Sequence, residues 1–137
     1  MKIILDTQVL IWWANDVSNI SNRVQSIIFD VNNELLVSLA SIWEIQIKVS
    51  LGKLSLPRPL PDIIARQIKE NQIKIMQIEL SHIYTLDLLS LHHRDPFDKI
   101  IIAQAMDEKV SIASIDKAFD AYSITSGTLR ERKDLVD

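Results

Sequence analysis

Residues 2–13 read KIILDTQVLIWW and give the clearest indication of how this chain folds. Residues 2–5 form a short, mainly apolar and β-branched segment, which is typical of a buried strand. Asp6 and Thr7 end that segment, and a second apolar run at residues 9–13 predicts a helix directly after it. A buried strand that runs straight into a helix is the expected opening of an α/β domain.

Strand-like and helix-like segments alternate along the rest of the chain. Further strands are predicted at residues 35–39, 73–78 and 110–112, and helices at residues 24–31, 63–68 and 95–106. This alternation favours a parallel sheet with helices on both faces. Residues 42–54 stay open, because apolar residues alternate there as in a strand, whereas Gly52 suits the end of a helix.

Length and composition fit one domain without cysteine chemistry. With 137 residues and 47% hydrophobic content, residues 1–137 are expected to form a single domain around one core. Residues 125–137 are mostly polar and are expected to form a loose tail or a frayed short helix. The absence of cysteine excludes disulfides, thiolate zinc sites and catalytic thiols. Apolar stretches stay below membrane-spanning length, so we expect a soluble, cytoplasmic protein.

The net charge weighs against a nucleic-acid partner. The formal charge is −3 at pH 7, whereas binding to phosphates usually depends on a basic surface. Two divalent cations would reverse the sign of that charge, because together they add four positive charges. The objection is therefore weaker if several acids share a metal site.

Two acids stand where a parallel sheet binds its ligands, beyond the carboxyl ends of its strands, and a third lies at the start of a helix. Asp6 follows the first predicted strand and Asp116 follows the last one. Asp98 lies in the first turn of the helix that Asp95 and Pro96 are expected to begin. Each acid also has a structural interpretation, since Asp6 and Asp98 suit helix N-termini and Asp116 suits a turn.

Other notable side chains have structural interpretations that the sequence alone favours. Glu44 stands four residues before Lys48, a spacing that allows an ion pair along a helix. Lys48 and Lys53 are candidates for contacts to phosphates, but ordinary solvated surface is the favoured interpretation of both. Three tryptophans have apolar neighbours and are assigned to the core or to a protein interface: Trp12, Trp13 and Trp43.

Five segments together resemble the PIN-domain proteins, and above all the VapC-type toxins of bacterial toxin–antitoxin pairs. They are LDTQVLIWW at 5–13, SIWEIQIK at 41–48, LGKL at 51–54, HRDPFDK at 93–99 and SIDKAF at 114–119. They follow the family's order between residues 2 and 122, and the Asp-Pro-Phe-Asp run at 95–98 is the most specific of them. The resemblance implies a three-layer α/β/α fold and places Glu44 on a helix.

The same resemblance implies a ribonuclease that depends on Mg2+ or Mn2+. The family's metal-site acids correspond to Asp6, Glu44, Asp98 and Asp116. Ser114 and Thr7 are expected to support these acids, Ser114 through a hydrogen bond to a metal-bound water. Arg94 and Lys99 are expected to contact substrate phosphates.

Carboxylates suit this chemistry, because Mg2+ is a hard cation that takes oxygen ligands and keeps several waters. A bound ion lowers the pKa of an attacking water and stabilises charge on the scissile phosphate. Without a cation the clustered acids repel one another, so metal is expected to stabilise the protein. The resemblance also implies three partners: RNA as substrate, a cognate antitoxin that covers the acidic crevice, and a second copy of the chain in a homodimer.

The chain departs from the family pattern in two places. Relatives usually have histidine where this chain has Gln8, which changes a contact to Asp6 but removes no metal ligand. Residues 125–137 also differ from the apolar last strand with which relatives end.

Two rival interpretations stay open. A haloacid-dehalogenase-like phosphatase with Asp6 as nucleophile needs a second aspartate at position 8, and a PIN-like interaction module would keep the acids without catalysis.

Overall fold

Four parallel strands form the centre of the part of the chain that the structure describes, residues 1–89 and 95–114. In the computed structural model the strands are β1 (Lys2–Leu5), β2 (Glu34–Ser38), β3 (Lys74–Met76) and β4 (Ser111–Ala113). Their order across the sheet is β3-β2-β1-β4. The predicted parallel sheet is confirmed, although β2 begins and ends one residue earlier than expected and β3 is shorter.

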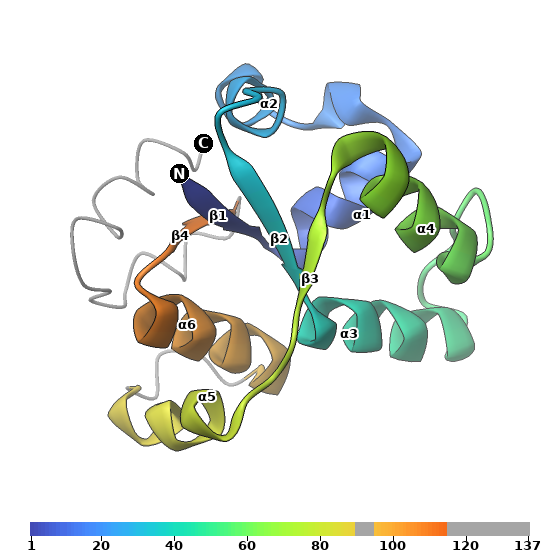
Figure 1. Ribbon diagram of the computed structural model, residues 1–137. Helices are drawn as coiled ribbons and strands as arrows, with labels where there is room; N and C mark the ends of the chain where they lie inside the picture. The colour runs from blue at the N-terminus through green and yellow to red at the C-terminus, as the bar shows by residue number, and fades with distance from the viewer. Residues whose placement is uncertain (90–94, 115–137) are drawn as a thin grey trace.

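Helices lie on both faces of this sheet (Figure 1). They are α1 (Thr7–Asn15), α2 (Asn22–Ile28), α3 (Leu39–Ser50), α4 (Leu60–Asn71), α5 (Leu80–Thr85) and α6 (Pro96–Glu108), with 3-10 turns at Val17–Asn19 and Leu86–Leu88. None of these described helices is long and apolar enough to cross a membrane.

Two hydrophobic cores, one on each face of the sheet, hold the layers together. Along β1, Ile3 and Leu5 enter the core beneath α1, α2 and α4, whereas Ile4 enters the core beneath α6. Leu36, which pairs with Ile4 in the parallel register, enters the same core as Ile4. Strands buried on both faces read as continuous apolar runs, as these do. The predicted three-layer α/β/α fold is therefore confirmed.

Helix α3 settles the open segment at residues 42–54: the helical alternative is correct and the strand alternative is wrong. Ser38 caps this helix, since its Oγ accepts a hydrogen bond from the backbone N–H of the second helical residue at 3.0 Å. At the other end Gly52 adopts a φ of 72°, the left-handed conformation that commonly follows a helix. Ile42 and Ile45, three residues apart, both pack into the core beneath α1.

Two local expectations are wrong or incomplete. The apolar pattern extends a helix to Val31, but α2 ends at Ile28 and Val31 is 95% exposed. Periodicity does not predict α5, which is a six-residue helix. A helix this short repeats its apolar spacing too few times to be recognised from the pattern alone.

The strand order leaves a crevice beside β1. The chain first places β2 and β3 on one side of β1, and then returns to place β4 on the other side. At such a switch point the connections that leave two neighbouring strands diverge, and a space opens at the carboxyl edge of the sheet. Asp6 follows β1 and Ser114 follows β4, so both residues lie at this edge.

Candidate functional site

Asp6 is fixed at the carboxyl end of β1 by contacts to two different elements. The residue is only 4% exposed. One carboxylate oxygen accepts a hydrogen bond from Val9 N at 3.0 Å and thereby caps α1, and the other accepts one from Ser114 Oγ. The capping interpretation of Asp6 is confirmed. Capping α1 does not need the hydrogen bond from Ser114, which ties Asp6 to the end of β4 as well.

Thr7 and Ser41 join the start of α1 to α3. Thr7 Oγ1 donates a hydrogen bond to Ser41 Oγ at 2.9 Å, and both residues are buried. Glu44 follows Ser41 by about one helical turn on α3. The Thr7 contact therefore fixes the position of Glu44 relative to Asp6.

Glu44 is a buried carboxylate with one oxygen paired and the other unpaired. Its Oε2 lies 3.0 Å from Lys48 Nζ, the ion pair that the four-residue spacing predicts. Its Oε1 is buried and has no hydrogen-bond partner among the described residues. Leaving a buried polar atom unsatisfied costs about 1–3 kcal/mol, and more when it is charged. A ligand that contacted Glu44 Oε1 would remove that cost.

The N-terminus of α6 contributes two more carboxylates. Asp95 caps the helix, because its Oδ1 accepts a hydrogen bond from Phe97 N at 2.9 Å, and Pro96 takes the predicted place in the first turn. Asp98 lies in the first turn of α6, where the positive end of the helix dipole favours a negative charge. The predicted start of this helix is confirmed.

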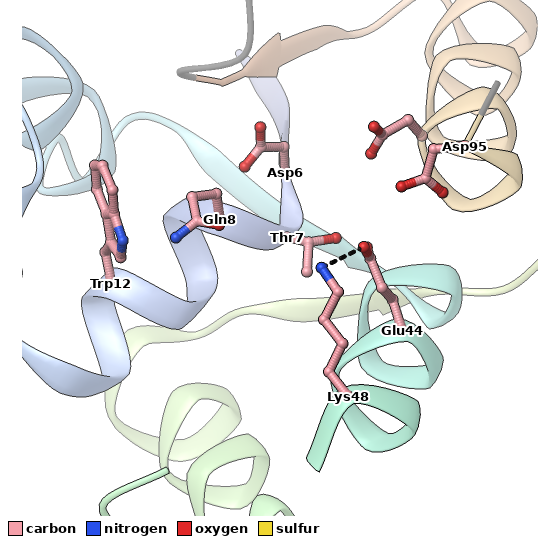
Figure 2. Close-up of a pocket in the computed structure, with 8 residues that line it drawn as sticks. Asp6, Thr7, Gln8, Trp12, Glu44, Lys48 and Asp95 are labelled. Atoms are coloured by element: carbon pink, nitrogen blue, oxygen red, sulfur yellow. Dashed lines mark ion pairs between the residues drawn. The ribbon is translucent and has the colours of Figure 1, made fainter. Parts of the chain in front are cut away.

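These side chains surround one pocket of about 330 Å³. Its lining residues are Asp6, Thr7, Gln8, Trp12, Glu44, Lys48, Asp95 and Asp98. Figure 2 shows the labelled carboxylates approaching from the end of β1, from α3 and from α6, with Gln8 and Trp12 on α1. Four carboxylates and one lysine share this space, so the pocket favours cations.

The donor set fits a hard divalent cation such as Mg2+ or Mn2+. It consists of carboxylate oxygens, including the unpaired Oε1 of Glu44, and contains no sulfur or imidazole ligand. No three acids of the pocket bring their oxygens all within 4.8 Å of one another.

Three of the four predicted metal-site acids lie around this pocket: Asp6, Glu44 and Asp98. The fourth, Asp116, and one predicted phosphate contact, Arg94, lie outside the described residues, as does the tail predicted at 125–137. The other predicted phosphate contact, Lys99, is half-buried on α6 and does not line the pocket.

Sequence reasoning misses several residues of the pocket. It favours solvated surface over a role beside the site for Lys48, whereas the structure places Lys48 in the pocket and against Glu44. It treats Asp95 only as a helix cap and assigns Trp12 to the core or a protein interface, and both line the pocket. Gln8, at the position linked to a contact with Asp6, lines the pocket too. The spacing of Glu44 and Lys48 was the one available signal, because a lysine that pairs with a site acid must lie beside the site.

The tryptophans differ in environment. Trp13 contacts Phe29 edge to face at 5.8 Å and packs against the core, as predicted. Trp12 also packs against the core, but it lines the pocket as well. Trp43 is 60% exposed and lines an apolar groove between α3 and α4, so core packing is wrong for it, and a protein interface stays a prediction.

A second group of potential metal ligands lies between α5 and α6, outside the pocket. His82 is buried, with Nε2 3.1 Å from Glu108 Oε2 and 3.7 Å from Asp107 Oδ2. Its Nδ1 accepts a hydrogen bond from Glu79 N at 3.0 Å, so the neutral ring carries its proton on Nε2 and donates it to Glu108. A cation on Nε2 would have to displace that proton, so we interpret this group as a structural link.

Comparison with known proteins agrees with this geometry. The family model of the PIN domain matches residues 3–124, which include all four predicted metal-site acids. This chain belongs to the PIN-domain family. The predicted PIN resemblance is thereby confirmed. Membership of this family argues against the phosphatase alternative, which also needs an aspartate at position 8, where this chain has Gln8.

Two relatives show how far the PIN similarity extends. Ribonuclease VapC16 of Mycobacterium tuberculosis is 33% identical over 61 residues, which are 44% of this chain and 43% of that protein. The match therefore spans less than half the length of this curated relative. A chain in the crystal structure of VapBC2 from Rickettsia felis, bound to a DNA fragment from their promoter, superposes with a TM-score of 0.66. That match covers 99% of this chain and 96% of the other at 14% identity, and it shows a common fold.

Proposed function

We propose that this chain is a divalent-metal-dependent ribonuclease and the toxin of a toxin–antitoxin pair. The observation that carries the proposal is the pocket in which Asp6, Glu44 and Asp98 meet, where one buried oxygen of Glu44 has no partner within residues 1–89 and 95–114. The family supports it, since the chain is a PIN domain and one curated relative is named a ribonuclease. Asp116 is proposed as the fourth acid on the strength of its sequence position.

The four acids are proposed to hold Mg2+ or Mn2+. When bound, the metal supplies a water of lowered pKa and offsets negative charge on the phosphate under attack. The chain supplies the positions: Val9 N and Ser114 Oγ orient the Asp6 carboxylate, and the Thr7 contact to α3 orients Glu44. Because Asp6 and Glu44 are buried, these contacts limit the movement of their carboxylates before any substrate binds.

The proposed partners follow from the charge of the pocket. RNA is the proposed substrate, with Arg94 and Lys99 proposed as phosphate contacts. A cognate antitoxin that placed an arginine against these carboxylates would form bidentate hydrogen bonds and exclude the metal. We also propose that the chain forms a homodimer and acts in the cytoplasm.

Cleavage of total cellular RNA tests the proposed activity. The purified protein, free of antitoxin, is incubated with RNA in Mg2+ or Mn2+, beside an EDTA control and the Asp98→Asn variant. We expect discrete cleavage by the wild type, none in EDTA, and a loss of about 10- to 100-fold or more in the variant. Mapping the cut ends then identifies the target RNA.

The matched control is Asp62→Asn, which removes the same charge from the exposed first turn of α4. This variant should cleave RNA at the wild-type rate. If the wild type and Asp98→Asn leave the RNA equally intact while metal still raises the melting temperature, the ribonuclease proposal is wrong. The PIN-like interaction module, with a metal site but no catalysis, then takes its place.

A further inference from the structure

Lys48 joins the buried end of the pocket to its exposed side. Its Nζ lies 3.0 Å from Glu44 Oε2, and the Lys48 side chain is 44% exposed whereas that of Glu44 is 7% exposed. Figure 2 shows this ion pair along the wall that α3 contributes to the pocket. Among the described residues that line the pocket, Lys48 is the one lysine or arginine.

A divalent cation and Lys48 would compete for the same carboxylate. Glu44 offers Oε1, which has no partner in the part of the chain that the structure describes, and Oε2, which Lys48 already contacts. A cation in the pocket would bring a second positive charge close to Lys48 Nζ, and like charges at such distances repel. The long, flexible and half-exposed lysine side chain can leave Glu44 and keep its ammonium in water.

A released Lys48 would stand where the pocket needs a positive charge. The pocket wall carries four carboxylates, which repel a phosphate backbone. A bound cation offsets part of that charge, and an ammonium beside it adds a direct ligand for a phosphate oxygen.

We propose that Lys48 exchanges partners when the metal binds. In the metal-free protein it neutralises Glu44, and in the metal-loaded protein it contacts a phosphate oxygen of single-stranded RNA. This inference rests on the proposed ribonuclease function. It gives Lys48 a role in both metal affinity and substrate binding, whereas a purely structural ion pair would affect neither.

Metal affinity is the first readout, and it needs no RNA. Calorimetric titration of Mn2+ compares the wild type with Lys48→Gln and with Lys53→Gln, which removes a charge from the exposed turn after α3. In Lys48→Gln the cation has no competitor for the Glu44 carboxylate, so this variant should bind Mn2+ about three- to tenfold more tightly. Lys53→Gln should change the Kd by less than about twofold. An unchanged or weaker Kd in Lys48→Gln, or no binding by either protein, overturns the inference.

RNA affinity is the second readout, measured by fluorescence anisotropy of a labelled single-stranded RNA oligonucleotide. Ca2+ replaces Mg2+ to limit cleavage, and EDTA gives the metal-free state. Lys48→Gln should weaken binding about three- to tenfold in Ca2+ and lower the salt dependence by about 0.7 in log–log slope, the value for one phosphate contact on a single strand. In EDTA it should bind as the wild type does, and Lys48→Arg should retain the contact in Ca2+.

Equal weakening of RNA binding in Ca2+ and in EDTA, or no weakening in either, would show that Lys48 does not exchange partners. Failure of the ribonuclease proposal has a different signature. In that case RNA stays intact in Mg2+ and Mn2+, while the opposite effects of Lys48→Gln on Mn2+ and RNA affinity remain measurable.

Discussion

Asp6 and Glu44 are both buried carboxylates, but their surroundings satisfy them to different degrees. Asp6 has a hydrogen-bond donor at each carboxylate oxygen, Val9 N and Ser114 Oγ. Glu44 has a partner at one oxygen, Lys48, and none among the described residues at the other. A buried charge destabilises a fold unless it is fully paired. Glu44 is therefore the residue at which stability of the metal-free protein and metal binding conflict.

Replacing Thr7 by valine tests whether one hydroxyl positions α3. Valine keeps the shape of threonine but cannot donate to Ser41 Oγ, which would stay buried without that partner. We expect Thr7→Val to lower the free energy of unfolding by about 1–2 kcal/mol. Urea unfolding in EDTA measures this change without a contribution from metal.

Two further variants separate this hydrogen bond from general effects of the substitution. If the contact is responsible, Thr7→Val combined with Ser41→Ala destabilises by less than the sum of the single changes. Thr85→Val removes an exposed hydroxyl that bonds to Ser81 O, and should change stability by about 0.5 kcal/mol or less. Additive effects of Thr7→Val and Ser41→Ala would show that the two residues act independently.

At the scale of the element, sequence patterns predict the regular strands and helices well and fail where tertiary contacts decide. The apolar residues from 45 to 51 alternate as in a strand, so periodicity alone misleads there, and in the helix Ile42 and Ile45 pack against the core. Helix α5 is stabilised at its start by the side chain of His82, which also reaches Glu108 on α6. Such a contact is invisible to periodicity.

Glu34 on β2 links three strands through charge, and this link gives a pH prediction. It lies 2.6 Å from Lys74 Nζ on β3 and 4.0 Å from Lys2 Nζ on β1. The hydrogen bond from Lys74 holds the pKa of Glu34 below its usual value of 4.5. A lowered folded-state pKa means that the stabilisation is present above pH 4.5 and is lost as the pH falls through the lower folded value.

The variant Glu34→Gln should therefore be less stable than the wild type at neutral pH, and the difference should shrink as the pH falls from about 5 to about 3. Urea unfolding at a series of pH values measures it. In a Lys74→Gln background the same substitution should show a smaller dependence on pH, because the main cause of the lowered pKa is gone. A stability difference that stays constant with pH would contradict the assignment to this charge.

At the scale of the whole molecule, the sequence predicts which acids belong to the site better than which residues surround them. The places of Asp6 and Asp98 follow from local rules, a strand end and a helix start. The pocket roles of Lys48 and Asp95 depend on how α3 and α6 meet beside β1, and local spacing does not determine that packing. Asp116 lies outside the described residues, so its place remains a prediction.

The last prediction concerns the stability of the whole fold with and without metal. Ligand at about 100 times its Kd stabilises the folded state by about 2.7 kcal/mol. For a domain of this size that corresponds to a rise in Tm of about 5–10 °C. Mg2+ or Mn2+ should produce such a saturable rise in the wild type, and EDTA should reverse it.

Compared with the wild type, Glu44→Gln should be no less stable in EDTA but less stable in Mg2+ or Mn2+. In EDTA it should be at least as stable as the wild type, because a buried and incompletely paired charge is gone and Lys48 is exposed enough to be solvated. In metal it should lose most of the rise in Tm, whereas Glu70→Gln, on the exposed face of α4, should keep it. If wild type and Glu44→Gln respond equally to metal, Glu44 is no more than an ion-pair partner of Lys48. The proposed metal centre in this pocket would then be wrong.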